Sequence, residues 1–458
     1  MDTLITFIPF FIAILSLVIG FFIIKKNSVA SFFIANRSIK TFIGSCTIMA
    51  AWTWGPALLV SSQQGYIGGL AQWFWFATPN TIAILIFGIL AAQLYKWQPK
   101  WQSKSLTLID LIKKDYDKNV VFCYFFIMLM VEIISTGIQL TAISLILKSF
   151  IGISSNLFII VVGLSMIIIA SSKGMITTVT ADMIKVCLIV VLVATSLFIF
   201  SSTPLFINNL PEKYLDWFQI FDKNLIWNFG IPNTIALIGG VAISGQMWQR
   251  AYSIKLKHLK SSIIGGSFLF YGMLLILGIL GMIAAVPLLG IGVANNQLAG
   301  LATLAHFTPY GVLLFSIVMI TALIATGASA LNAGSMVFTD LTANTQNSIL
   351  VSRLYMIAVI ILGTVIAIFN FPLLYLIQAM GIRIAFLIPT ILSLYFVRVR
   401  SDIIFLGIVL SSISFIVLFF NYGLKAEAGL VCLGFSVLFA IYAYLSRNYN
   451  IRTLTFRQ

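Results

Sequence analysis

The stretch Ala50-Ala51-Trp52-Thr53-Trp54-Gly55-Pro56 interrupts an apolar segment and predicts a helix that is broken at membrane depth. Proline removes a helix hydrogen bond, and glycine weakens the helix locally. A second segment begins Phe229-Gly230-Ile231-Pro232 and carries Gly239-Gly240 further in, so we expect a second break within it. Unwound backbone inside a membrane is tolerated only where it lines a cavity. The two breaks therefore indicate a cavity at membrane depth, and the alternative is that these glycines and prolines serve helix packing.

The composition is that of a membrane protein. Of the 458 residues, 60% are hydrophobic and only 9% are charged, whereas a soluble domain typically carries about 25% charged residues. Apolar runs recur along the chain, and each is long enough to cross about 30 Å of hydrocarbon. Because the runs are continuously apolar rather than alternating, they predict helices and not the strands of a barrel.

Thirteen such runs predict thirteen transmembrane helices. Their approximate ranges are 3–24, 41–60, 70–93, 120–147, 154–171, 174–200, 226–248, 262–287, 311–338, 350–371, 372–397, 402–421 and 428–446. With the N-terminus outside, the outside loops hold only Lys148, Lys213, Lys223 and Lys425, and most other Lys and Arg residues fall inside. This asymmetry follows the positive-inside rule and predicts a cytoplasmic C-terminus in an inner (plasma) membrane. The net charge of +15 is then topological and does not indicate nucleic acid.

No linker divides the chain, so we expect one membrane domain over 1–458. The first run lacks a basic start and a cleavage site, which favours a retained anchor over a signal peptide. Segment Thr107–Lys114 predicts a short surface helix with Thr107 as N-cap. The outside loop Asn295–Pro309 is interpreted as a connection, with a lid as the alternative.

The two breaks are spaced as an inverted repeat requires. With the N-terminal run set aside, they lie in helices one and six of twelve, and an odd spacing of five helices gives the two halves opposite orientations. The predicted division is an extra helix at 3–24, a first repeat at 41–200, a second repeat at 226–397 and two C-terminal helices at 402–446.

Three further stretches carry a resemblance to a known family. They are Ser31–Ser38 (SFFIANRS), Gly245–Arg250 (GQMWQR), and Ala325–Asn332 (ATGASALN) followed by Phe338-Thr339-Asp340. In this order and spacing they resemble motifs of the sodium:solute symporter family, over about residues 30 to 445. The resemblance implies a leucine-transporter-like fold of five plus five inverted helices, with thirteen spans. It also implies sodium-driven symport by alternating access.

The resemblance also implies a sodium site. By motif, it would use the backbone carbonyls of Ala50, Thr53 and Ala322 together with positions Ala325 and Thr326. A hard cation takes oxygen ligands, and an unwound helix offers free carbonyls. The family usually has two adjacent hydroxyl residues where this chain has Ala325-Thr326, so one ligand is missing. The affinity or the identity of the coupling ion, Na+ or H+, therefore stays open.

Glu132, Asp182, Lys185 and Arg383 lie well within predicted spans. Such residues are costly in lipid, and they mark ion or substrate paths or internal ion pairs. Asp182 and Lys185 are one helical turn apart, and the favoured interpretation is a structural ion pair. The family has an acidic residue matching Asp182, thought to assist the uptake or release of sodium, and more often glutamine at Lys185. The alternative is that the Lys185 ammonium replaces the ion and permits proton coupling. Glu132 is expected either to pair with Arg383 or to contact a cationic substrate or a proton.

The substrate is expected at the first break. Trp52 and Trp54 would wall a small cavity there, and the predicted contacts are completed by Gly55, Ala57, Gly239 and Gly240. Within the family, the stretches Trp52–Ser62 and Trp73–Ala77 look most like the active urea transporters. The resemblance therefore implies a urea-like solute, another small amide or an amine, carried by a protein that can function as a monomer.

Other classes of function are disfavoured. His258 and His306 are isolated, and no phosphate-binding loop or nucleophile motif is present, which argues against an enzyme or a primary pump. A transporter-derived sensor would carry a long soluble C-terminal region, and a channel would need a continuous polar lining. We expect neither.

Overall fold

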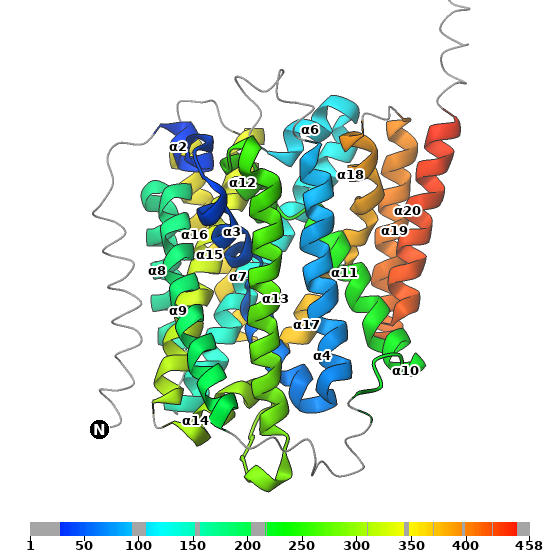
Figure 1. Cartoon of the computed structure of the whole chain (residues 1–458). Coiled ribbons are helices and arrows are strands. Elements are labelled where there is room, and N and C mark those ends of the chain that lie inside the picture. Colours follow the sequence, from blue (N-terminus) through cyan, green and yellow to red (C-terminus); the bar gives the residue numbers. More distant parts are fainter. Residues whose placement is uncertain are drawn as a thin grey trace, which may run out of the picture.

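The computed structural model describes residues 28–93, 107–151, 156–202, 216, 218–308, 310–342, 348–369, 371–395, 399–423 and 425–446, and these form a bundle of helices (Figure 1). The expected span at 3–24 lies outside the described residues. Within them, the one strand-like feature is an isolated parallel bridge between Ile39 and Ile254.

The helices follow one another along the chain with few long connections. They are α2 (Val29–Ile34), η1 (Ala35–Arg37), α3 (Thr41–Trp52), α4 (Gly55–Ala92), α6 (Leu108–Asp115), α7 (Lys118–Ile151), α8 (Asn156–Lys173), α9 (Met175–Ser202), α10 (Lys223–Leu225), η5 (Ile226–Gly230), α11 (Ile231–Ala242), α12 (Gly245–Ser253), α13 (Leu256–Ala284), η6 (Pro287–Leu289), η7 (Asn296–Leu298), α14 (Ala299–Phe307), α15 (Gly311–Thr342), α16 (Ser348–Ile368), α17 (Leu373–Ala379), η8 (Met380–Phe386), α18 (Leu387–Leu394), α19 (Ser401–Tyr422) and α20 (Ala426–Leu445).

The distribution of apolar and charged side chains in the bundle is that of a membrane protein. In the described residues, ten helices are long and apolar enough to cross a membrane, and two shorter apolar helices, Thr41–Trp52 and Ile159–Lys173, accompany them. Large apolar side chains such as Phe198 (73%) and Phe420 (73%) are exposed, while Asp182 and Arg250 are completely buried. A protein surrounded by lipid is expected to bury its charged side chains and to expose apolar ones such as phenylalanine. The count of thirteen spans, the repeat and the orientation of the termini stay predictions.

The first predicted break is confirmed. Helix α3 ends at Trp52, and Thr53 (φ −85°, ψ 82°) and Trp54 (φ −99°, ψ 170°) are not helical. Helix α4 then begins at Gly55, with proline in its first turn, where the missing N–H costs no helix hydrogen bond. The helical geometry is lost at Gly68 (φ −135°, ψ 23°) and Gly69 (φ 56°, ψ −143°), so α4 consists of two helical parts, the second ending at Ala92. The break makes two carbonyls, Ala50 O and Thr53 O, accessible to a donor from another helix.

The second break exists but lies elsewhere than expected. Neither Pro232 nor Gly239-Gly240 interrupts α11, which runs to Ala242, and the chain leaves the helix at Ile243 and Ser244 before α12 begins. Pro232 lies in the first turn of α11, where proline is tolerated. The glycines serve close packing instead, because a Cβ at Gly239 would lie 2.6 Å from the Cα of Ile384.

A third interruption was not expected. The predicted span 372–397 consists of α17, the 3-10 segment η8 and α18, and η8 carries Arg383. Its sequence, MGIRIAF, contains no proline and only one glycine. The tighter winding of a 3-10 helix changes the direction of its side chains and often marks a functional region.

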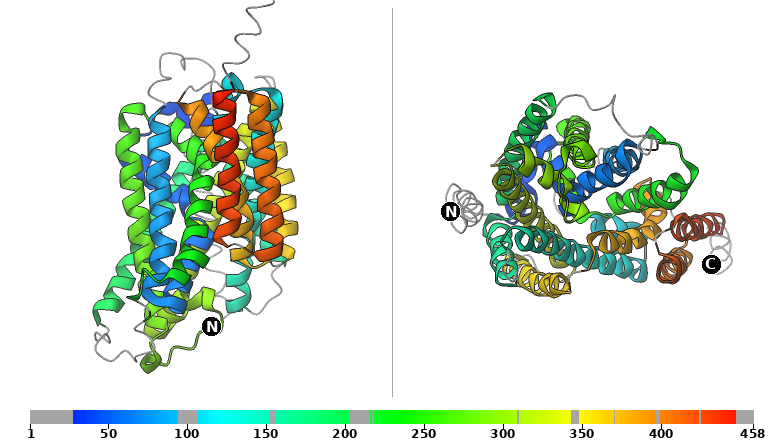
Figure 2. Two further views of the ribbon diagram at one scale, coloured as in Figure 1. Left: turned by 90° about the vertical axis from the view of Figure 1, so that its right-hand side faces the viewer. Right: turned by 90° about the horizontal axis from the view of Figure 1, so that it is seen from below.

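The packing brings the interrupted segments to the middle of the bundle. Helix α13 packs against α3 and α4, and α15 packs against α7, α8 and α9. Among the ten candidate spans, α15 has the most buried apolar window, at 78%. Helices α19 and α20 lie side by side at the edge (Figure 2). The bridge at Ile39 and Ile254 joins the start of α3 to the exit of α12, so both broken segments are fixed at one end, here named the α12 end.

Two predicted segments outside the main spans, Thr107–Lys114 and Asn295–Pro309, both contain helices. The surface helix expected after Thr107 is confirmed as α6, where Thr107 and Asp110 form a capping box. The segment interpreted as an outside loop contains η7 and α14, and α14 packs against α13 and α15. We call this opposite end of the bundle the α14 end (Figure 1).

Candidate ion and substrate site

The first break, α9 and α15 meet at the side chain of Lys185. Its Nζ donates hydrogen bonds to Ala50 O (2.8 Å), Thr53 O (2.6 Å) and Thr326 Oγ1 (2.6 Å). The residue is completely buried. An ammonium group has three N–H donors, and here each one meets an oxygen acceptor. These oxygens are among those that the family resemblance assigns to sodium, so the ammonium lies on the expected ion site.

The remaining expected ligands surround the same point. Ala322 O accepts a hydrogen bond from Thr326 Oγ1 (2.9 Å), and the same hydroxyl lies 2.7 Å from Thr53 O. Ala325 is completely buried and provides only a methyl group. In the described part of the chain, no cluster of three or more His, Cys, Asp or Glu residues could hold a metal ion. The oxygens around Lys185 belong to backbone carbonyls and a hydroxyl, so they are uncharged, and Lys185 supplies the positive charge.

Asp182 does not form the expected ion pair with Lys185. Its Oδ2 accepts hydrogen bonds from Arg250 Nη2 (2.8 Å) and Thr47 Oγ1 (2.5 Å), and the Asp182 and Arg250 side chains are both completely buried. Arg250 Nη2 also donates to Ser329 Oγ (2.8 Å). The guanidinium, brought in by α12, binds only Oδ2 of the carboxylate, while Asp182 Oδ1 and Arg250 Nε stay without a hydrogen-bond partner among the described residues. The Lys185 ammonium is left to bind the carbonyls. The sequence indicated only Lys185, one helical turn away, as a partner of Asp182, and it contained no local signal for Arg250.

The Asp182–Arg250 pair joins four helices on the α12 side of the ion site. Thr47 belongs to α3, Asp182 to α9, Arg250 to α12 and Ser329 to α15. Breaking such a pair leaves a buried charge without a partner, which costs about 3–5 kcal/mol. The pair therefore links α3, α9, α12 and α15 at this end of the bundle.

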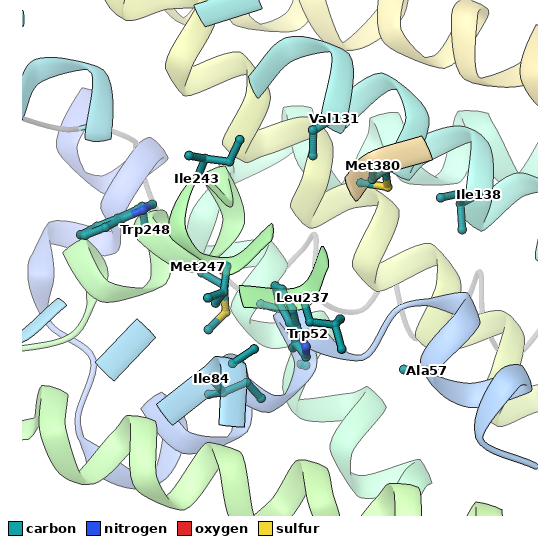
Figure 3. Close-up of a cluster of buried hydrophobic side chains, with 14 of the residues drawn as sticks. Trp52, Ala57, Ile84, Val131, Ile138, Leu237, Ile243, Met247, Trp248 and Met380 are labelled. Atoms are coloured by element: carbon teal, nitrogen blue, oxygen red, sulfur yellow. The ribbon is translucent and has the colours of Figure 1, made fainter. Parts of the chain in front are cut away.

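A small cavity of about 40 Å³ lies beside the ion site. Its lining residues are Ala51, Trp52, Trp54, Val131, Glu132, Ser135, Ser244, Gln246, Thr326, Met380 and Arg383. They come from the first break and the end of α3, from the observed second break before α12 and the start of α12, and from α7, α15 and η8. Figure 3 shows Trp52, Val131 and Met380 around this region, together with Leu237 of α11. Thr326 connects the cavity to the ion site, because it lines one and binds Lys185 in the other.

Only some of the predicted substrate residues line the cavity. Trp52 and Trp54 line the cavity, and Trp52 Nε1 is fixed by a hydrogen bond to Asn80 Oδ1 (3.1 Å). Gly55 N donates to Gln139 Oε1 (2.9 Å), so its amide is already satisfied. Ala57 is completely buried but does not line the cavity.

Gly239 and Gly240 are not cavity-lining residues either. Gly239 lies against the backbone of η8. Gly240 has no Cβ and so leaves room for the side chain of Arg383. A Cβ at Gly240 would lie 2.7 Å from Cζ of Arg383. Arg383 Nε donates to Met380 O (2.7 Å), so the guanidinium is fixed between η8 and α11.

Glu132 faces the cavity from α7. Its Oε2 accepts a hydrogen bond from Gln246 Nε2 (3.4 Å), and the residue is 2% exposed. Arg383 is 5% exposed and lines the same cavity. Among the described residues, no ion pair with N···O within 4.0 Å joins these two, although each lies in the electrostatic field of the other. The pairing that the sequence favoured is therefore replaced by two charges facing one cavity.

A larger cavity of about 580 Å³ lies toward the α14 end. Gln63 of α4, Thr141 and Ser144 of α7, Asn295 and Phe371 are among its lining residues. At the α12 end, among the described residues, the buried Asp182–Arg250 pair lies between α3, α9, α12 and α15.

Sequence reasoning missed several polar residues of the site. Arg250 and Gln246 were recognised only as parts of a motif, and Ser135, Gln139 and Ser244 were not considered. A signal existed on α7, because Glu132, Ser135 and Gln139 recur at intervals of three and four, the spacing of one helix face.

Comparison with known proteins supports the fold, and over part of the chain it indicates a group of relatives. No protein-family model matches the chain. A urea active transporter of Saccharomyces cerevisiae is 24% identical over 159 residues, which are 35% of this chain and 21% of that protein. A urea-proton symporter of Oryza sativa subsp. japonica is 23% identical over 150 residues, 33% of this chain and 20% of that protein. The chain therefore spans only about a fifth of the length of these curated relatives.

The similarity to solved structures extends over nearly the whole chain. A Na+-coupled sialic acid symporter in a substrate-bound, outward-open state has a TM-score of 0.78 at 15% identity, covering 96% of this chain and 97% of that one. A nucleobase-cation-symport-1 family transporter, closed with bromovinylhydantoin bound, has a TM-score of 0.56 at 12% identity, with 91% and 95% covered. At such identities the likeness shows the fold alone. The chain is a multi-pass membrane protein with the fold of a secondary transporter.

Proposed function

We propose that this protein is a secondary active symporter of a small polar solute, and that it is coupled to protons through Lys185. The observation that carries this proposal is the Lys185 ammonium bound to Ala50 O, Thr53 O and Thr326 Oγ1. A sodium ion at this site would need the same oxygens. The partial similarity to a urea-proton symporter and to urea active transporters adds support for both the coupling and the solute.

The protonation state of Lys185 would control the first break. In the charged form, three N–H donors meet three acceptors and tie α9 to the end of α3 and to α15. A neutral amine has two N–H donors and a lone pair, so one of the oxygens would face that lone pair and lose its bond. The break would then be free to move relative to α9 and α15. Asp182 and Arg250 are the charged groups whose fields reach Lys185, and they pair with each other.

Alternating access follows from the two sides of the site. With the α12 end in the cytoplasm, as the distribution of Lys and Arg predicts, the larger cavity faces outside and the Asp182–Arg250 pair closes the inside. A solute arriving through the larger cavity would settle in the small one, next to Thr326. Release to the cytoplasm would require loss of the proton from Lys185 and opening of the α12 end.

The test is uptake of labelled urea into proteoliposomes under an imposed pH or sodium gradient. We expect accumulation above equilibrium with an inward proton gradient, and its loss in Lys185→Gln. The control is Lys260→Gln, which removes an exposed lysine at the start of α13 and should behave as wild type. Uptake that merely equilibrates would refute symport, and a Lys185→Gln protein with the normal response to pH would remove Lys185 from coupling.

A second variant addresses the sodium alternative. Lys185→Ala combined with Ala325→Ser removes the tethered cation and supplies the second hydroxyl that the family usually has. We expect this double variant to gain sodium-driven uptake while losing the response to pH. If the wild type itself requires sodium, the ammonium is not the coupling group and the sodium interpretation holds.

A further inference from the structure

Two buried opposite charges face the small cavity without neutralising each other directly. Glu132 and Arg383 both line it, they are 2% and 5% exposed, and in the described chain no ion pair connects them. Each has its own support from the surrounding protein. Arg383 is held by Met380 O and lies against Gly240, and Glu132 is held by Gln246. The two side chains are thus positioned separately, with space of the cavity available to a third group.

The charge balance of the cavity restricts what can occupy it. Glu132 and Arg383 are the two ionisable side chains among the lining residues, and when both are ionised their charges cancel. The Lys185 ammonium lies behind Thr326 and does not itself line the cavity. An ion entering this buried space would add a charge without a partner, which is strongly unfavourable where water is excluded. A neutral molecule with a strong dipole adds no net charge, and it can satisfy both groups at once.

The volume restricts the size of the occupant. A water molecule needs about 10–15 Å³ of such space, so about 40 Å³ accommodates a solute of about three or four heavy atoms. The hydroxyl of Ser135 also lines the cavity, and it can donate to or accept from such a solute.

We propose that Glu132 and Arg383 form a charge-balanced selectivity site for a neutral, planar amide of the urea type. The carbonyl oxygen of the solute accepts hydrogen bonds from the Arg383 guanidinium, and its N–H groups donate to the Glu132 carboxylate. Ions of the same size are rejected because they leave one of the two charges facing a like charge. This assignment rests on the proposed function, in that the occupant is the transported solute.

The experiment measures binding to purified full-length protein in detergent, with no gradient, by isothermal titration calorimetry. The probes are urea, acetamide, guanidinium and acetate, four planar molecules of equal heavy-atom count that differ in charge. We expect the wild-type protein to bind urea and acetamide at least tenfold more tightly than either ion. Equal or tighter binding of guanidinium or acetate would overturn the proposal, whatever the variants do.

Two variants should shift the preference in opposite directions. In Glu132→Gln, Arg383 loses its counter-charge, so acetate should gain at least tenfold relative to acetamide. In Arg383→Gln, Glu132 loses its counter-charge, so guanidinium should gain at least tenfold relative to urea. The double variant Glu132→Gln/Arg383→Gln has no charged side chain in the cavity lining, so it should again prefer neutral ligands but bind them more weakly than the wild type. Shifts in the same direction in both single variants, or no shift, would contradict the assignment.

A third variant covers the case in which the charge variants fail to fold. Ser135→Val fills part of the cavity without changing its charge, and it should weaken urea binding at least tenfold. The matched control, Ser201→Val at the exposed end of α9, should bind urea as the wild type does. Normal urea binding in Ser135→Val would place the solute elsewhere. Since these titrations use no gradient, failure of coupled uptake would refute symport while leaving the selectivity result intact.

Discussion

Replacing Thr326 by valine tests the ion site with almost no change of shape. The hydroxyl accepts from Lys185 Nζ at 2.6 Å and lies within hydrogen-bond distance of Thr53 O and Ala322 O. Valine keeps the branched side chain and leaves the buried ammonium with two acceptors for three donors. A hydrogen bond to a charged group contributes about 1.5–3 kcal/mol, and about 1.4 kcal/mol corresponds to a factor of ten.

The expected effect is therefore a requirement for about ten to a hundred times more external protons at half-maximal uptake. The assay is the initial rate of urea uptake into proteoliposomes, measured against external pH at a fixed internal pH. Thr326→Ser keeps the hydroxyl and is the matched control, so it should remain within a few fold of wild type. A valine variant with the wild-type pH profile would refute the placement of the coupling proton on Lys185.

The remaining predictions concern residues that hold the ion site and the small cavity in place. Asp182→Asn leaves Arg250 buried without a counter-charge and should lower the free energy of unfolding by about 3–5 kcal/mol, measured by thermal melting in detergent. The double variant Asp182→Asn/Arg250→Met should recover most of this loss, and a double variant no more stable than the single one would contradict the pairing. Gly240→Ala places a Cβ 2.7 Å from the Arg383 guanidinium and should raise KM for urea at least tenfold. Gly434→Ala, where nothing lies within 4 Å of the added Cβ, should leave KM unchanged, so an unaltered KM in both would show that Gly240 does not position Arg383.

Local sequence features predicted the first break well because its causes are local. Trp52-Thr53-Trp54-Gly55-Pro56 combines a helix end with a proline suited to the next helix start. The same reasoning misplaced the second break, because Pro232 also suits a helix start and begins α11. The actual break at Ser244 has a different cause. The Ser244 side chain accepts from Met247 N and caps α12, a signal no stronger than that of many serines.

Long-range pairing was beyond the reach of the sequence. Helical periodicity places Asp182 and Lys185 on one face, which made a pair the natural interpretation. The carboxylate instead binds Arg250, whose position depends on how α12 packs against α3 and α15. Likewise, Arg383 lies on the 3-10 segment η8, and the sequence of η8 gives little indication of that winding.

The Lys185 ammonium differs from a dissolved ion in being covalently attached to α9. A tethered ligand acts at an effective concentration set by the reach of its tether, of the order of millimolar even for short flexible links, and this side chain is completely enclosed by the helices around it. External sodium would have to displace a competitor that cannot diffuse away, so under the proposed coupling its concentration would have little influence on the site. If Lys185 carries the coupling proton as proposed, such a transporter would not depend on a supply of salt, and acidity would set the direction of transport.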